Sequence, residues 1–293
     1  MTPSSPSLQQ RSEPYPHWSF TTATGDELRI VPERGGLVTG WRSGGEEWLY
    51  FDAERYADPT KSTRGGIPVL FPICGGLAGS PLPQHGFARD LPWQLEELAA
   101  AAGASAGPGV RLSLVDTEAT RAVFPHAFTL ELEYRLTPGC LAITARVNNT
   151  STSGAASPAL PFSLGLHPYF AVQDLAAVRL EGLPECCFDH IPMAEAVTAG
   201  QLERLTTGVD FLAHPSGAVR LLDAAAPAGG RWIAMETQAP LDLAVVWTEP
   251  PRPMVCLEPW TAPRGAMASG DRLLQVPPGE TLELAGTYRA GVG

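Results

Sequence analysis

Three short polar segments interrupt otherwise apolar stretches of this chain, and each carries side chains that could move protons or hold an anion. The first joins Arg64–Pro68 with Gln84–Arg89, the second is Leu166–Phe170, and the third is Cys256–Trp260. Together they supply a carboxylate, two imidazoles and guanidinium groups, which amount to a base, an acid and a polar clamp. This combination suits a reaction that moves a proton on and off adjacent oxygens without a metal or a cofactor.

Charge and composition exclude several classes of partner. The 293-residue chain has a formal charge of -11, which repels nucleic acid phosphates and anionic lipid, so an anionic ligand requires a local basic pocket. No run approaches the roughly 18 apolar residues that span a bilayer, and Met1–His17 lacks the basic start and apolar core of a secretory signal. The sequence therefore predicts a cytoplasmic protein that binds neither nucleic acid nor a membrane.

The cysteines do not suggest a scaffold. There are five, so they cannot all pair, and none stand in Cys-x-x-Cys spacing: Cys74, Cys140, Cys186, Cys187 and Cys256. We expect reduced, mostly buried thiols rather than disulfides or a structural zinc site, and no metal or cofactor.

The elements that must position the polar segments have the periodicity of strands. Residues Phe128–Leu136 alternate apolar and polar, break at Pro138-Gly139, and resume alternating over Leu141–Val147, which predicts a β-hairpin. Similar strand signals occur at Glu27–Val31, Trp48–Phe51, Arg111–Val115, Ala177–Leu180, Leu241–Trp247 and Thr281–Arg289. Gly and Pro residues separate these runs, as in sheets joined by tight turns.

Helical patterns are short and few. Leu95–Ala102 has a helical pattern, but an Ala/Gly-rich segment follows it, so no long helix is expected there. Many short strands without alternating long helices predict an all-β protein, a large antiparallel β-sandwich. We expect a single domain over residues 18–293, preceded by a flexible tail over residues 1–17.

The polar segments, in their order along the chain, resemble those of the galactose mutarotase-like superfamily, in particular the aldose 1-epimerase and hexose-6-phosphate 1-epimerase branch. The matching elements are Arg-Gly-Gly-Ile-Pro, His-Gly-Phe-Ala-Arg, Leu-His-x-Tyr-Phe and Glu-Pro, and the resemblance extends from about Asp26 to Ala290. It implies a large antiparallel supersandwich and an isomerase that interconverts the α and β anomers of free or phosphorylated hexoses. We expect a small sugar or sugar phosphate as the partner, and a monomer or weak homodimer.

Anomer exchange needs one base and one acid. Ring opening removes the proton of the anomeric hydroxyl while the ring oxygen is protonated, and reclosure reverses both transfers. A carboxylate with a pKa raised by partial burial and an imidazole protonated near neutral pH match these tasks. The resemblance places the base at Glu258, within an apparent strand that ends at Pro259, and the acid at His167. The alternatives are a glutamate paired with a neighbouring arginine and a core histidine bonded to backbone.

The resemblance also supplies binding residues. Arg64, Gln84 and Arg89 match the residues that surround the anionic end of the substrate in the hexose-phosphate branch, and a forked guanidinium suits a phosphate. His85 has a role in substrate binding or as a second acid, and Asp210 matches an aspartate that binds sugar hydroxyls. Structural ion pairs are the alternative for both arginines, and a loop-capping role is the alternative for Asp210.

The sequence departs from the family pattern at three places. Asp210 is followed by Phe-Leu-Ala instead of Arg-x-Tyr, Pro168 stands where the phosphate branch often has threonine, and Arg264 follows the Glu-Pro element, where it could contact substrate or only the sheet edge. The function predicted is a hexose mutarotase, preferentially for a hexose 6-phosphate. Alternatives are a mutarotase for non-phosphorylated aldoses, a noncatalytic carbohydrate-binding protein, and a glycoside hydrolase using Glu258 and Asp210.

Overall fold

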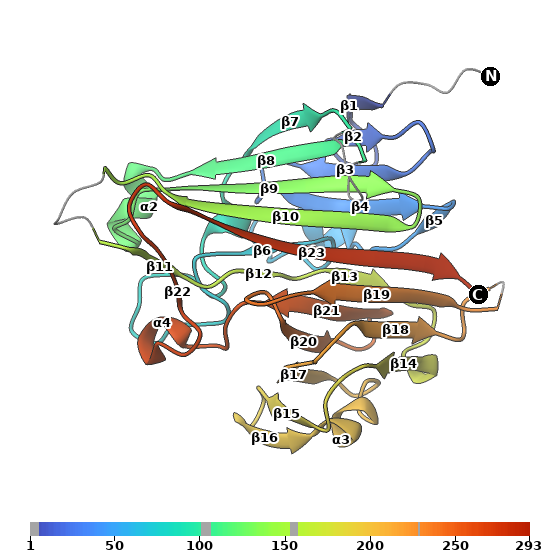
Figure 1. Ribbon diagram of the computed structural model, residues 1–293. Coiled ribbons are helices and arrows are strands. Elements are labelled where there is room, and N and C mark those ends of the chain that lie inside the picture. Colours follow the sequence, from blue (N-terminus) through green and yellow to red (C-terminus); the bar gives the residue numbers. More distant parts are fainter. Residues whose placement is uncertain (1–5, 101–106, 153–157, 228) are drawn as a thin grey trace.

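Antiparallel β-sheet dominates the computed structural model, which describes residues 6–100, 107–152, 158–227 and 229–293 (Figure 1). One eight-stranded sheet runs in the order β14 (Val178–Glu181), β18 (Val219–Asp223), β19 (Arg231–Thr237), β23 (Thr281–Val292), β10 (Cys140–Asn149), β9 (Phe128–Thr137), β8 (Gly109–Val115), β7 (Gln94–Leu98). The predicted all-β architecture of antiparallel sheets is confirmed.

A second large sheet carries the polar segments. Its order is β16 (Ala194–Val197), β15 (Cys186–Asp189), β17 (Val209–Ala213), β20 (Leu243–Thr248), β21 (Met254–Trp260), β12 (Gly165–Leu166), β6 (Val69–Leu70), with β13 (Tyr169–Ala171) also paired to β21. A five-stranded sheet consists of β1 (Ser7–Arg11), β2 (His17–Thr21), β3 (Glu27–Val31), β4 (Leu37–Ser43) and β5 (Glu46–Glu47), and a two-stranded sheet of β11 (Leu160–Phe162) and β22 (Leu274–Val276).

The helices are short, as the sequence predicted. They are α1 (Ala53–Ala57), α2 (Glu118–Val123), α3 (Thr198–Leu202) and α4 (Ala266–Ser269), with 3₁₀ turns at η1 (Ala88–Asp90) and η2 (Leu175–Ala177). Within the residues that the structure describes, no helix is long and apolar enough to cross a membrane.

Most predicted strands are present, and the hairpin is placed correctly. Pro138-Gly139 joins β9 to β10, and Leu136 pairs with Leu141 across the turn. The helical interpretation of Leu95–Ala102 is wrong within the described residues: β7 pairs there with β8, because the sheet edge overrides the local helical preference. Residues 101–106 lie outside the described residues.

Two further expectations differ from the structure. Trp48–Phe51 forms only isolated bridges, in which Leu49 meets Phe170 and Phe51 meets Gly65. The predicted tail over residues 1–17 includes β1, which pairs with β2 at the edge of the five-stranded sheet, so this part is structured; residues 1–5 lie outside the described residues.

Alternation along β21 determines what faces the core. Val255 and Leu257 belong to the main hydrophobic core, which also contains residues of β9 and β23 from the facing sheet. The hydroxyl of Tyr288, in β23, donates a hydrogen bond of 2.9 Å to the Leu257 carbonyl and so ties the two sheets together. Since successive side chains point to opposite faces, Glu258 and Trp260 lie on the outer face of the second sheet.

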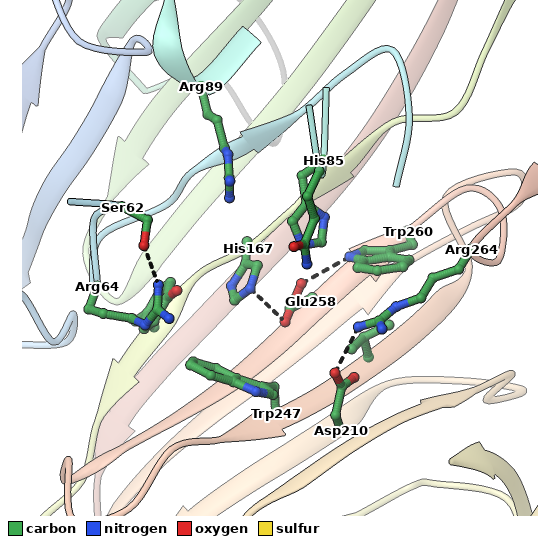
Figure 2. Close-up of a pocket in the computed structure, with 13 residues that line it drawn as sticks. Ser62, Arg64, His85, Arg89, His167, Asp210, Trp247, Glu258, Trp260 and Arg264 are labelled. Carbon is green, nitrogen blue, oxygen red and sulfur yellow. Dashed lines mark hydrogen bonds and ion pairs between the residues drawn. The ribbon is translucent and has the colours of Figure 1, made fainter. Parts of the chain in front are cut away.

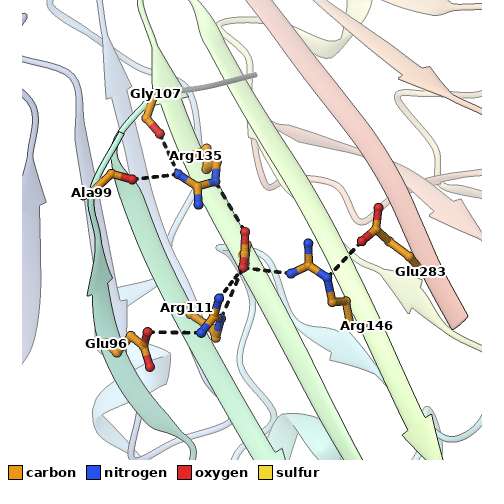
Figure 3. Close-up of polar contacts among 8 residues, drawn as sticks. Glu96, Ala99, Gly107, Arg111, Arg135, Arg146 and Glu283 are labelled. Atoms are coloured by element: carbon orange, nitrogen blue, oxygen red, sulfur yellow. Dashed lines mark hydrogen bonds and ion pairs between the residues drawn. The ribbon is translucent and has the colours of Figure 1, made fainter. Parts of the chain in front are cut away.

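A cluster of charged side chains extends over β7, β8, β9, β10 and β23 of the other sheet (Figure 3). The buried carboxylate of Glu133 accepts hydrogen bonds from Arg111 and Arg146 at 2.6 and 2.8 Å and from Arg135 at 3.4 Å. Glu96 and Glu283 bind the outer sides of Arg111 and Arg146. We call these six side chains the Glu133 network. The network contains three arginines and three glutamates, so its formal charges cancel, and its ion pairs link neighbouring strands of the sheet.

Candidate active site

Three neighbouring strands form the floor of a cavity of about 260 Å³. In the antiparallel register, Asp210 of β17 lies opposite Trp247 of β20, and Val245 of β20 lies opposite Glu258 of β21. All these side chains share one face of the sheet, because each occupies the outward position of its strand. Strand alternation therefore brings residues 48 positions apart in sequence onto one surface.

Loops above the floor bring in the first two polar segments. His167 follows β12, and its backbone N–H donates to the Pro68 carbonyl at 2.9 Å, which fixes the turn that leads into β13. His85 adopts a left-handed conformation with φ of 67° and precedes Gly86, with φ of 72°. A side chain at Gly86 would lie 2.1 Å from the Phe71 carbonyl oxygen, so only glycine permits this close approach.

A buried acid and a buried imidazole face each other at the centre of the cavity (Figure 2). His167 Nε2 lies 3.3 Å from Glu258 Oε1, and Trp260 Nε1 donates to Glu258 Oε2 at 3.0 Å. Glu258 is 1% exposed. Its polar partners are an imidazole and an indole, so the alternative of a glutamate neutralised by an arginine is wrong.

Burial disfavours a charge on either member of this pair. It raises the pKa of Glu258 well above its ordinary value, and nearby Asp210 adds to that effect. Burial also lowers the pKa of His167 well below its ordinary value, and His85 and Arg89 act in the same direction. This direction is opposite to the expectation of an imidazole protonated near neutral pH.

The contacts of the His167 ring exclude the alternative of a core histidine whose ring is bonded to backbone. Its Nδ1 is buried and has no hydrogen-bond partner among the described residues, so the ring is not fixed by backbone. Instead it stacks on Tyr169 with centroids 4.8 Å apart and meets the Trp247 ring edge-on at 5.8 Å. Aromatic packing holds the ring, while Nε2 remains directed at Glu258.

His85 is a neutral neighbour of this pair. The Gly75 backbone N–H donates to His85 Nδ1 at 3.0 Å, so the proton of the neutral ring is on Nε2. Burial and the charge of Arg89 lower the pKa of His85 to about 3. Its Nε2 lies 3.4 Å from the Gln84 amide nitrogen at the cavity wall. A neutral imidazole of this kind can donate a hydrogen bond to a sugar oxygen.

The arginines that line the cavity differ in their partners. Arg64 binds Glu249 through Nε at 2.8 Å and Ser62 through Nη1 at 2.9 Å. Its structural ion pair, one of the alternatives above, is therefore present, although the guanidinium still lines the cavity. Arg89 extends into the cavity and has no hydrogen-bond or ion-pair partner among the described residues (Figure 2). It is a half-buried cation without a counter-charge.

Asp210 is held on both sides. Arg264 Nη2 donates to Oδ2 at 2.7 Å, and His190 Nδ1 lies 2.7 Å from Oδ1. Burial would raise the pKa of Asp210, but the bond to His190 and the charge of Arg264 outweigh it, so the pKa is lowered. Asp210 is thus an ionised acceptor in a strand, and the loop-capping alternative is wrong.

The structure brings all seven predicted site residues into this one cavity: Arg64, Gln84, His85, Arg89, His167, Asp210 and Glu258. Six more line it, namely Ser62, Tyr169, Val245, Trp247, Trp260 and Arg264. Val245 and Trp247 could have been found from the predicted strand Leu241–Trp247, since alternation places both on one face. Nothing in the sequence marked Ser62 or the buried His190 behind Asp210.

Among solved structures, the Slr1438 protein from Synechocystis shares 32% identity, covers 100% of this chain and 98% of its own, and has a TM-score of 0.82. A galactose mutarotase-like protein from Clostridium acetobutylicum is 16% identical with a TM-score of 0.75, covering 98% of this chain and 99% of its own, which shows a shared fold.

Among curated sequences, a protein of Cenchrus ciliaris named "Putative glucose-6-phosphate 1-epimerase" is 34% identical over 62% of this chain and 56% of its own length. The chain spans about half the length of such curated relatives. The sequence model of the aldose 1-epimerase family matches residues 20–289, from β2 to β23, and so includes every strand of the cavity floor. On this match, the chain belongs to the aldose 1-epimerase family.

Proposed function

We propose that this chain interconverts the α and β anomers of a hexose and that a hexose 6-phosphate is its preferred substrate. The observation that carries the proposal is the facing pair of Glu258 and His167 in a cavity that also contains the unpaired cation Arg89. The cavity volume of about 260 Å³ lies near the lower end of small-molecule sites, about 300 Å³, which favours a single sugar.

Ring opening uses the two members of the pair together. Glu258 takes the proton of the anomeric hydroxyl, and His167 gives a proton to the ring oxygen, so the C1–O5 bond breaks and an aldehyde forms. Rotation about C1–C2 presents the other face of the aldehyde, and the reverse transfers close the ring. In the reactive form of the pair the proton lies on His167 and Glu258 is ionised, and a carboxylate with a raised pKa is then a stronger base than an ordinary one, which suits the weakly acidic hydroxyl.

The arginines supply the reason for a phosphate. A phosphate dianion between Arg64 and Arg89 would give the unpaired Arg89 a counter-charge and make charge-assisted hydrogen bonds. Arg89 and Arg64 are also among the charges that lower the pKa of His167. A bound phosphate offsets both charges, so it raises the pKa of His167 and favours the protonated acid only when substrate is present. The names of the curated relatives support the same substrate class.

A mutarotase for non-phosphorylated aldoses is the second candidate, and the Arg64–Glu249 pair favours it. Glu249 already neutralises Arg64 and also binds Arg252 at 2.7 Å. A neutral sugar would leave this arrangement undisturbed and would use Arg89 as a donor to a hydroxyl. A carbohydrate-binding module needs no facing base and acid, so the His167–Glu258 pair argues against that alternative.

Hydrolysis of a glycoside is less well supported. That reaction uses two carboxyl groups with free access to the anomeric carbon. Here Asp210 is occupied by Arg264 and His190, whereas the group that faces Glu258 at the centre is an imidazole.

We retain as part of the proposal a monomer or weak homodimer that acts in the cytoplasm.

NMR exchange spectroscopy tests the proposal directly. The exchange rate between anomers is measured for glucose 6-phosphate, glucose and galactose, with and without the protein. Selective acceleration for the phosphorylated sugar supports the proposal, and equal acceleration of all three supports the second candidate. Absence of acceleration for every sugar contradicts both.

A further inference from the structure

A third buried side chain lies beside the proposed base and acid, and neither the proposed reaction nor the sugar cavity uses it. Cys256 precedes Glu258 by two positions in β21, so both side chains point to the same face of the sheet. His167, Cys256 and Glu258 each offer one ligand atom, and these three atoms all lie within 4.8 Å of one another. All three residues are buried, and Cys256 is 0% exposed.

The three donors are close to the spacing of zinc ligands. Zinc bonds of about 2.0–2.1 Å to N and O and about 2.3 Å to S place one sulfur and two N or O ligand atoms about 3.3–3.6 Å apart in a tetrahedron. His167 Nε2 and Glu258 Oε1 are already 3.3 Å apart. The Cys256 sulfur lies within 4.8 Å of both atoms, so a side-chain movement on the order of 1 Å completes three corners of a tetrahedron.

We propose that His167, Cys256 and Glu258 bind one Zn²⁺ ion, with the fourth ligand position open to the cavity. Imidazole nitrogen, thiolate sulfur and carboxylate oxygen are the donors that zinc takes in proteins. A thiolate, a carboxylate and a neutral imidazole also offset the two positive charges of the ion, so the buried complex carries no net charge. Mg²⁺ and Ca²⁺, which require oxygen ligands, do not fit this set.

The fourth position follows from which side chains reach the cavity. His167 and Glu258 line it, whereas Cys256 does not line it and packs against Tyr169 and Met254. An ion bound by all three therefore has the thiolate behind it and the cavity in front. It occupies the proposed base and acid, so zinc and sugar exclude each other. This exclusion rests on the proposed function, whereas metal binding itself does not.

Cobalt substitution provides a readout that is independent of activity. Co²⁺ takes the same tetrahedral ligands and shows a near-ultraviolet charge-transfer band when a thiolate is bound. Addition of Co²⁺ to the full chain is expected to produce this band with one ion per chain, and an equimolar amount of Zn²⁺ is expected to remove it. Absence of the band at saturating Co²⁺ overturns the proposal.

Variants locate the site. Cys256→Ser is expected to abolish the band and to weaken Zn²⁺ binding by at least about 100-fold, more than loss of a supporting contact, which costs about 10–100-fold. Cys256→Ala serves the same purpose if the serine variant does not fold. Cys187→Ser removes another buried thiol, in β15, and is expected to retain both the band and the affinity. Unchanged zinc affinity in either folded Cys256 variant overturns the proposal.

Activity assays test the exclusion. Zn²⁺ is expected to slow anomer exchange by at least tenfold at saturation, to lose effect as sugar concentration rises, and to be reversed by a chelator; Mg²⁺ is expected to do nothing. If the cobalt band forms but the chain exchanges no anomers even without metal, the zinc site stands and the proposed function fails. A band with full activity at saturating Zn²⁺ overturns the exclusion.

Discussion

At the scale of single residues, the site depends on the two buried groups His167 and Glu258. The only ion-pair partner that the structure gives Glu258 is His167, and the reverse also holds among the described residues. Trp260 adds only an indole N–H bond to Glu258. Burial therefore shifts both toward their neutral forms, which is the condition under which small changes in nearby charge alter the protonation state.

Removal of the base tests its role. Glu258→Gln keeps the size and the bond to Trp260 but cannot take a proton, so we expect anomer exchange to slow by about 10²–10⁴-fold, the usual contribution of general base catalysis. Sugar binding should change little. Exchange is measured by NMR and binding by calorimetry. A variant that folds, binds sugar and exchanges at the wild-type rate would contradict the assignment.

Replacement of Arg89 tests the phosphate clamp. Arg89→Gln is expected to lower kcat/KM for glucose 6-phosphate by about 10–100-fold, the equivalent of one charged hydrogen bond of about 1.5–3 kcal/mol, and to leave glucose less affected. Arg121→Gln is the matched control, because Arg121 is an exposed arginine in α2 that pairs with Asp116 and does not line the cavity. Equal losses for both sugars would argue for a general structural role.

The same variant has a consequence for pH dependence. The positive charge of Arg89 lowers the pKa of His167, so its removal should raise that pKa and let the imidazole keep its proton to higher pH. Titration of the His167 ring by NMR in the sugar-free protein measures this. A downward shift in Arg89→Gln, or none, would contradict the assigned cause.

At the scale of elements, the Glu133 network makes β8, β9 and β10 interdependent. Partial burial opposes ionisation of Glu133, but the hydrogen bonds and charges of Arg111 and Arg146 outweigh it and lower its pKa. A lowered folded-state pKa contributes stability above the unfolded-state pKa, and this stability is lost as pH falls through the folded-state value. Acid should therefore loosen these strands.

Glu133→Gln should reproduce the loss at neutral pH. It leaves three partly buried arginines without their shared carboxylate, and we expect a loss of about 1–3 kcal/mol in the free energy of unfolding, less than for a fully buried pair. Denaturant unfolding of the wild type and the variant measures this. Glu131→Gln, on the same strand, is the control with a smaller expected effect. A Glu133→Gln loss no greater than the control's would show that the network adds nothing.

The sequence predicts some strands correctly and others wrongly, depending on whether the signal is local. The β9–β10 hairpin was predictable because alternation and a Pro-Gly turn are local signals. Residues Leu95–Leu98 were mispredicted because their strand exists only through pairing with β8, which no local pattern reveals. Motifs alone predicted that Glu258 and His167 share a site, and both line the cavity. The partner of Arg64 could not be predicted, because Glu249 lies 185 residues from it in sequence.

At the scale of the whole molecule, the cavity opposes the overall charge. The chain carries a formal charge of -11, yet the cavity is lined by Arg64, Arg89 and Arg264. Glu249 and Asp210 neutralise two of these arginines, so the local positive charge available to an anion comes from Arg89. The expected local basic pocket is thus smaller than a count of arginines suggests.

Removal of strand β1 tests whether this edge strand supports the cavity. It lies at a sheet edge, is half-buried or exposed, and contributes no residue to the cavity; the backbone N–H of Leu8 reaches Glu97 at 3.1 Å. A chain beginning at Ser12 is expected to exchange anomers at the wild-type rate, with a small loss of thermal stability. The measurements are NMR exchange and thermal unfolding. A large loss of exchange in the folded, shortened chain would show that β1 supports the site.

The strand floor and the loop wall of the cavity come from different parts of the chain. Asp210 and Glu258 are fixed by sheet register, while Arg64, Gln84 and Arg89 come from one loop-rich stretch between β5 and β7. Substitutions in that stretch are therefore expected to alter which end group a sugar must carry without moving Glu258, the proposed base. Changes in these loops alone are therefore expected to alter sugar preference. A variant library confined to residues 62–89 is the starting point for engineering a new preference.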